Sequence, residues 1–358
     1  MAAKAWYKPS ALPQLIARFD PPPAAGASKR AIEVWTTTCI VTNFGMRRDI
    51  ADRTPHEDRK SPLLPSCSIL INPANPNLTG PNSFPYFPRG GPQPLQQPSR
   101  EAHHIMGYVS QWGGMDVGGG MLFSAEAIDG LVHQLGGLRL RAECALVPTH
   151  RYSKAYANQQ TQPESKENDR ENSIENGDDA KCPVGTAVIT SPGGAELQKH
   201  YDAIVHTTPP FHNYPPTMAK DLKEILGIEK SSELHSWSRE LLRSCYRQSF
   251  ILAFGNNNSR VADKQNSFMS NPFGFLLFDK PSAEQIQRVA VPLLGSGCRD
   301  FPKDVALEVA ALESASWLSN DNCQKMKDVE NIVVFGLLEV EDAEELSAKL
   351  ERNISLLQ

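Results

Sequence analysis

Polar residues and glycines that could bind a ligand are concentrated at three places along the chain. The first is Asn72–Asn75 in the segment NPANPNLTG, which directly follows the apolar run CSILI. The amides of Asn72 and Asn75 can both donate and accept hydrogen bonds without adding charge, which suits a sugar hydroxyl. Asn and Pro are also common in turns that end strands. The residues alone leave both interpretations open.

The second place is the glycine-rich segment QWGGMDVGGGMLFSAEAIDGLVHQLGG at 111–137, in which Gly118, Gly119 and Gly120 precede a run of helical period. Backbone N–H groups at a helix start favour an anion, so these glycines could bind a diphosphate. The spacing matches neither GxGxxG nor GxxxxGK[ST], which disfavours nucleoside triphosphate hydrolysis. A flexible glycine linker is the alternative interpretation.

The third place is VAVPLLGSGCRDFP, in which Gly295, Ser296 and Gly297 follow an apolar run and precede a second helical segment. The small residues leave N–H groups and a hydroxyl within reach of a phosphate, and Phe301 can lie against a ribose. Two such loops indicate that the ligand carries a diphosphate.

Short runs of branched residues alternate with longer segments of helical period, and this alternation predicts a mostly parallel sheet covered by helices. The expected strands are Ile32–Thr42, Cys67–Ile71, Ala187–Thr190, Ala203–Thr207, Val289–Leu294 and Ile332–Leu338. The expected helices are Ser124–Leu135, Ser236–Phe254, Lys303–Leu318 and Ala343–Leu356.

Polar and proline-rich segments interrupt this pattern and predict insertions at about 81–110, 151–182 and 255–285. Residues 1–30 are expected to form a poorly ordered N-terminal extension. The remainder, 31–358, is predicted to be one α/β domain.

The bulk composition excludes several classes of protein. The net charge is −5, with 36 basic and 41 acidic residues, so nothing indicates nucleic acid as a partner. The seven cysteines are scattered without a CxxC pair, which predicts neither disulfides nor a metal site. No run approaches the ~20 apolar residues of a membrane helix. We therefore expect a cytoplasmic or nuclear monomer without membrane association.

In their order, these segments resemble the macro domain family, whose two loops read approximately NAAN-x-x-L-x-GGGG and GTGxxGxP. The counterparts are Asn72–Asn75 with Leu78 and Gly80, and then Gly295–Pro302. PVGTAVIT and YDAIVHTTPP are similar to the family's GxAxxT and YVIHTVGP segments, and IVVFGLLEVEDAEELSAKL resembles its last strand and helix. The resemblance is closest to the MacroD-like hydrolase branch and extends discontinuously over roughly residues 30–357.

The resemblance implies a three-layer α/β/α sandwich with a mixed, mostly parallel sheet, which binds ADP-ribose without a cofactor. Asp49 and Ile50 are the nearest match to the family's adenine-binding Gly-Asp-Ile turn. The asparagines would hold the distal ribose. The expected ligand-binding residues are Asp49, Ile50, Ala74, Gly118, Gly119, Gly120, Gly295, Ser296, Gly297, Cys298 and Phe301.

Family members that cleave ADP-ribose linkages resemble one another around GGVDGAIH, in which the aspartate orients or activates water. Both GGMD at 113–116 and IDGLVH at 128–133 are similar to it. We prefer Asp116 as the catalytic carboxylate, because Asp129 lies further into the helix, where it could simply be solvated. Asn72 and Asn75 would orient the water or the ribose. His206 is expected to be a hydrogen-bonded structural residue.

The sequence is therefore compatible with three functions. The chain could hydrolyse mono-ADP-ribosyl or O-acyl-ADP-ribose linkages, with ADP-ribose or an ADP-ribosylated protein as its partner. It could instead read ADP-ribose without turnover, or act through its insertions as an interaction module.

Overall fold

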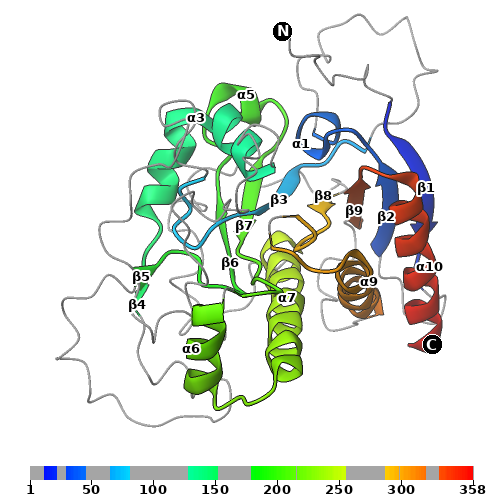
Figure 1. The fold of residues 1–358 in the computed structure, drawn as a ribbon. Coiled ribbons are helices and arrows are strands. Elements are labelled where there is room, and N and C mark those ends of the chain that lie inside the picture. The colour runs from blue at the N-terminus through cyan, green and yellow to red at the C-terminus, as the bar shows by residue number, and fades with distance from the viewer. Residues whose placement is uncertain are drawn as a thin grey trace, which may run out of the picture.

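The computed structural model describes residues 12–21, 30–45, 65–80, 128–151, 179–214, 216–254, 287–297, 299–319 and 330–357. They form a seven-stranded sheet between two layers of helices, which is the predicted three-layer α/β/α sandwich (Figure 1). The strand order is β1-β2-β9-β8-β3-β7-β6. The strands are β1 (Gln14–Phe19), β2 (Arg30–Thr36), β3 (Ile69–Pro73), β6 (Ala187–Thr190), β7 (Ala203–Thr207), β8 (Gln287–Pro292) and β9 (Asn331–Leu337).

The sheet is mixed but mostly parallel. The five central strands, β2, β9, β8, β3 and β7 in sheet order, pair in parallel. The edge strands β1 and β6 pair antiparallel with their neighbours. The inner strands are nearly continuous apolar runs because helices cover both of their faces. In β7, for example, every residue of AIVHT is buried. Such apolar runs are the pattern from which the strands are predicted.

Two separate groups of helices cover the sheet (Figure 1). One face packs against α7 (Ser231–Phe254), α9 (Lys303–Ser319) and α10 (Val340–Leu356), and the other against α1 (Ile40–Asn43), α3 (Ile128–Leu146) and α5 (Ala195–Gln198). Side chains of β3 alternate between the layers: Ile69 and Ile71 join the first core and Leu70 joins the second. Asn72 therefore points towards the α3 layer.

The helices bury one face each. In α10, the buried residues Ala343, Leu346, Leu350 and Ile354 recur at three- and four-residue intervals and pack into the first core. A short helix, α6 (Pro216–Leu226), joins a smaller apolar cluster with Leu234 of α7. None of the described helices is long and apolar enough to cross a membrane.

The junction between the neighbouring strands β3 and β8 is a topological switch point. From β3 the chain continues to β6 and β7 on one side, and from β8 it continues to β9 on the other. Ligands of open parallel sheets bind at such a point, beyond the carboxyl ends of the strands. The segments that leave these two ends are Ala74–Gly80, which continues the first predicted ligand-binding loop from the end of β3, and Leu293–Phe301, which contains the third.

Two expected boundaries are wrong, those of the N-terminal extension and of the first strand. The extension at 1–30 contains β1, which pairs with β2 from Gln14↔Thr36 to Phe19↔Ile32. The apolar run Ile32–Thr42 is not one strand, since β2 ends at Thr36 and α1 follows. The predicted insertion at 151–182 begins and ends in a small antiparallel ladder between β4 (His150–Arg151) and β5 (Asp179–Ala180), so its ends lie together.

Candidate functional site

Asn72 is the centre of a buried polar cluster between the sheet and α3. Its side chain is 0% exposed, and Nδ2 donates to Oδ1 of Asp129 at 2.7 Å and lies 3.1 Å from Nδ1 of His206. Its Oδ1 has no hydrogen-bond partner. An amide held through its nitrogen, with a buried carbonyl oxygen that lacks a partner, can accept a hydrogen bond from a ligand hydroxyl that reaches it.

His206 holds the Asn72 amide from the neighbouring strand. Burial lowers the pKa of His206 to about 3, so the imidazole is neutral. If Nδ1 accepts from Asn72, the proton is on Nε2, which lies 2.9 Å from the hydroxyl of Thr190. That hydroxyl in turn donates to the carbonyl of Ser191 at 2.9 Å. His206 is thus the hydrogen-bonded residue expected from the sequence, and it also adjoins Asn72.

Asp129 and His133 face this cluster from successive turns of α3. Asp129 is 6% exposed, so the expectation of a solvated carboxylate is wrong. Its Oδ1 lies 3.5 Å from Nε2 of His133. Burial raises the pKa of Asp129 and lowers the pKa of His133, and both shifts favour the neutral forms. The mutual attraction of the two groups opposes both shifts, so their 3.5 Å contact is an ion pair only when Asp129 is deprotonated and His133 is protonated.

The segments NPANPNLTG, which ends at Gly80, and IDGLVH, which contains Asp129 and His133, lie next to each other. Gly80 is the last residue described before Ile128, and a Cβ added to it would lie 2.6 Å from Cγ of His133. Its φ of +64° also favours glycine. Gly80 and the helix bearing Asp129 are therefore neighbours, although a long segment separates them in sequence. The sequence does not show that Asp129 lies close to the Asn72–Gly80 segment, and this closeness bears on the choice between Asp116 and Asp129.

Asn75 braces its own loop. Its Oδ1 accepts from the backbone N–H groups of Asn77 and Thr79 at 3.1 and 3.2 Å, and its Nδ2 donates to the carbonyl of Gly80 at 3.0 Å. The side chain is therefore already satisfied by the loop, unlike that of Asn72. Ala74 anchors the start of the loop, because its N–H donates to the carbonyl of Thr207 on β7.

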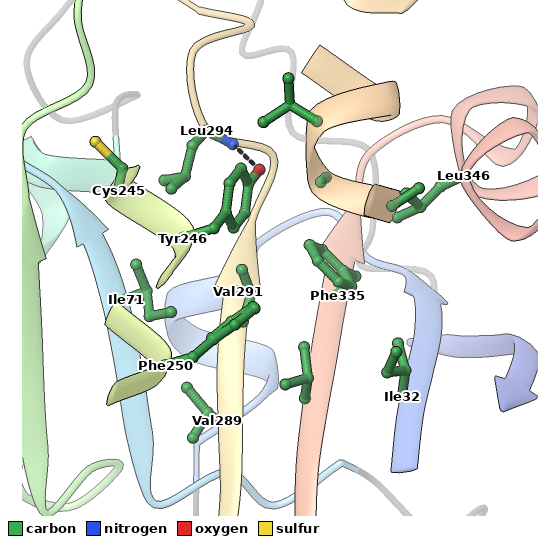
Figure 2. Packing of buried hydrophobic residues seen from close by; sticks show 14 of the residues in the cluster. Ile32, Ile71, Cys245, Tyr246, Phe250, Val289, Val291, Leu294, Phe335 and Leu346 are labelled. Atoms are coloured by element: carbon green, nitrogen blue, oxygen red, sulfur yellow. Dashed lines mark hydrogen bonds between the residues drawn. The ribbon is translucent and has the colours of Figure 1, made fainter. Parts of the chain in front are cut away.

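A side chain of α7 holds the loop that follows β8. The Tyr246 hydroxyl of α7 accepts from the N–H of Leu294 at 2.9 Å (Figure 2). Gly295 follows with a φ of +85° and is buried, whereas Ser296 and Gly297 are exposed. Phe301 is buried and packs near Gly295 and His212. It therefore supports the loop and offers little surface to a ribose, contrary to the sequence expectation.

Arg299 links the loops that the sequence singled out, but was not itself singled out. It is 5% exposed, its Nη2 lies 3.5 Å from the carbonyl oxygen of Ala74, and its guanidinium stacks over the ring of Phe211 at 4.4 Å. Its charge also acts on Asp129. A buried cation beside two strand ends could attract an anionic ligand. The only sequence feature that could have pointed to Arg299 as a site residue is its position in the segment GSGCRDFP.

The remaining predicted site residues lie outside the described part of the chain. They are Asp49, Ile50, Asp116, Gly118, Gly119, Gly120 and Cys298.

Three potential metal ligands lie together although the sequence predicts no metal site. His133, Cys144 and His206 are all buried, and one potential ligand atom from each lies within 4.8 Å of the other two. Burial raises the pKa of Cys144 to about 12, so its thiol is protonated in this environment. The wide sequence separation of the three residues hid their convergence.

No family model and no curated protein matches the sequence. Solved structures of macrodomains do match. One from Oceanobacillus iheyensis with ADP is 15% identical, with a TM-score of 0.40, and the match covers 95% of this chain and 98% of that one. Another of that organism, with MES bound, is 15% identical with a TM-score of 0.41, over 95% and 98% of the two chains. The Trypanosoma brucei macrodomain in complex with ADP-ribose is 14% identical, with a TM-score of 0.35, over 79% and 62%.

Proposed function

We propose that this chain binds ADP-ribose at the carboxyl ends of β3 and β8. The observation that carries this proposal is Asn72, a fully buried amide that Asp129 and His206 hold in place while its Oδ1 remains without a partner. That oxygen would accept a hydroxyl of the distal ribose. Across the switch point, the exposed Ser296 and Gly297 would meet the diphosphate through the hydroxyl and backbone N–H groups.

We further propose hydrolysis of a mono-ADP-ribosyl or O-acyl-ADP-ribose linkage, with Asp129 as the preferred carboxylate. Its position beside Asn72 supports this choice over Asp116. Asp129 would accept a proton as the water oxygen bonds to the ribosyl or acyl carbon, and the bond to the leaving oxygen would break. The proton would then pass to that oxygen. A raised pKa suits this exchange, because a stronger base accepts the proton more readily.

A reader without turnover is the second candidate. The burial of Asp129 and its hydrogen bond to Asn72 favour it, since in a reader this carboxylate would serve to hold the amide. The same contacts would then support binding without chemistry.

The two candidates are separated in two steps. Calorimetric titration of the full chain with ADP-ribose should show saturable heat, and its absence at high protein concentration would rule out both. Incubation with a mono-ADP-ribosylated protein should then release ADP-ribose if the chain is a hydrolase.

The variants Asp129→Asn and Asp116→Asn form a matched pair. Asp129→Asn should lower the release rate by at least about tenfold, the equivalent of ~1.4 kcal/mol, while Asp116→Asn retains it. Loss of release in Asp116→Asn alone would show that the other carboxylate is catalytic. Binding without release by the wild-type chain would identify a reader.

A further inference from the structure

Three potential metal ligands converge from three separate segments. His133 lies in the first part of α3, Cys144 near its end, and His206 on β7. Cys144 follows His133 by eleven residues, which would be about 16 Å along a straight helix. Their ligand atoms nevertheless lie within 4.8 Å, because α3 is two helices joined at a sharp kink at Gly137. The kink itself therefore brings the imidazole and the thiol together.

Neighbouring segments hold this kink in place. The N–H of Gly194 donates to the carbonyl of Gly136 at 2.7 Å, and Cβ atoms added to Gly193 or Gly194 would collide with the corner. At the far end, Nζ of Lys181 donates to the carbonyls of Cys144 and Ala145, both at 2.9 Å. Cys144 is thus fixed from both sides in its position opposite His133.

His133 has an unmet requirement in this arrangement. Its side chain is 2% exposed, yet neither Nδ1 nor Nε2 has a hydrogen-bond partner. A buried polar group without a partner destabilises a fold by about 1–3 kcal/mol. Coordination of a metal ion would satisfy one of these two nitrogens, and Cys144 and His206 would supply further ligands.

We propose that His133, Cys144 and His206 form a binding site for a divalent transition-metal ion of the zinc class. Metal binding would release the proton of the Cys144 thiol to solvent. The resulting thiolate and the two imidazoles are soft or borderline ligands, which suit Zn²⁺ or Co²⁺ and disfavour Mg²⁺ and Ca²⁺. Sγ of Cys144 lies 4.0 Å from Nε2 of His206. The ligand atoms need to move inward by about 1 Å or less to reach ordinary Zn–S and Zn–N bond lengths.

The groups around the site can adapt to a metal. Binding through Nε2 of His206 moves the ring proton to Nδ1, and a half-turn of the Asn72 amide presents its unpartnered Oδ1 to that proton. Thr190 keeps its bond to the Ser191 carbonyl. Asp129 is then released from Asn72, and its carboxylate, 3.5 Å from His133, can balance the metal charge together with the thiolate. The metal-bound arrangement occupies the Asn72 Oδ1 that the proposed function assigns to the ribose, so metal and ADP-ribose would bind as alternatives, and the metal site does not require ADP-ribose binding.

The test uses the full chain, loaded with Co²⁺ and dialysed without ligand. The wild type should retain about one equivalent, with a visible spectrum of tetrahedral cobalt and a near-ultraviolet thiolate-to-cobalt charge-transfer band. Cys144→Ser should lose that band. Cys67→Ser is the matched control, because Cys67 is also a fully buried thiol in the α3-side core and should leave the band unchanged.

A second variant keeps the test decisive if Cys144→Ser fails to fold. His133→Leu removes an imidazole that makes no hydrogen bond, so it should fold, and addition of Zn²⁺ should no longer raise the melting temperature as it does in the wild type. The proposal is overturned if the folded wild type retains no cobalt, or if the charge-transfer band persists in Cys144→Ser. ADP-ribose plays no part in either measurement, so the two proposals can fail separately.

Discussion

The amide Nδ2 of Asn72 donates a 2.7 Å hydrogen bond to Oδ1 of Asp129, a residue 57 positions further along the chain. The bond joins the carboxyl end of β3 to the first turns of α3. Both groups are buried, so neither can exchange its partner for bulk water at low cost. This contact therefore determines how the candidate ribose-binding amide is oriented.

Asn72→Ala should lower the free energy of unfolding by about 1–3 kcal/mol, because it leaves Asp129 and His206 without their shared donor. Urea unfolding measures the effect. Asn353→Ala is the control, since Asn353 is also buried but its Nδ2 has no hydrogen-bond partner. The free energy of unfolding should fall clearly less in Asn353→Ala than in Asn72→Ala. Equal losses in both variants would mean that the contacts of Asn72 contribute nothing specific.

Gly80→Ala should destabilise the fold more than Gly227→Ala. The two glycines have nearly the same φ, +64° and +65°, so a side chain costs about 1–2 kcal/mol of backbone strain at either. Only at Gly80 would the new Cβ also meet a ring, 2.6 Å from Cγ of His133, whereas nothing lies within 4 Å at Gly227. The comparison is made by thermal unfolding. Equal melting temperatures would contradict the packing of Gly80 on His133.

Folding stability should fall on acidification, in part through His212. Burial, and then the charge of His235, lower the pKa of His212, and Arg239 acts in the same direction while Asp300 opposes it. The rings of His212 and His235 stack with centroids 4.4 Å apart. Because the pKa of His212 is lowered in the folded state, its stabilising contribution is complete above the unfolded pKa of about 6.5 and is lost progressively as pH falls from there through the folded pKa.

The measurement is the urea midpoint of wild type and His212→Gln between about pH 7.5 and about pH 5.5. The variant should lose less stability over this range than the wild type. Other histidines with lowered pKa values, such as His206, act equally in both proteins and cancel in the comparison. An identical pH dependence would contradict the role given to His212.

The sequence predicted the parts of the fold in which local pattern and burial agree. Ala187–Thr190 and Ala203–Thr207 were predicted with the bounds that β6 and β7 have, because each is a branched apolar run with polar or turn residues beside it. The mixed α/β fold class is likewise confirmed. β1 was missed because its partly exposed residues QLIARF lie in a proline-rich region and owe their strand form to pairing with β2.

The candidate site was predictable only where its residues lie at or just beyond the ends of strands. Asn72 and Gly295 were identified correctly as residues at the strand ends of the switch point. Asp129 was ranked below Asp116 because a long intervening segment hides its closeness to Asn72. Arg299 and the convergence of His133 with Cys144 depend on tertiary packing and on the kink at Gly137, which a periodic pattern does not encode.

The most direct test of the ADP-ribose site is calorimetric titration of Ser296→Asp and Ser355→Asp with ADP-ribose. Both serines are exposed, and both changes add one negative charge, but only Ser296 lies in the proposed diphosphate loop, since Ser355 is on α10. Ser296→Asp should weaken binding at least about tenfold, or ~1.4 kcal/mol, while Ser355→Asp binds like the wild type. Equal affinity of both variants, or no binding by the wild type, would contradict the site proposed between β3 and β8.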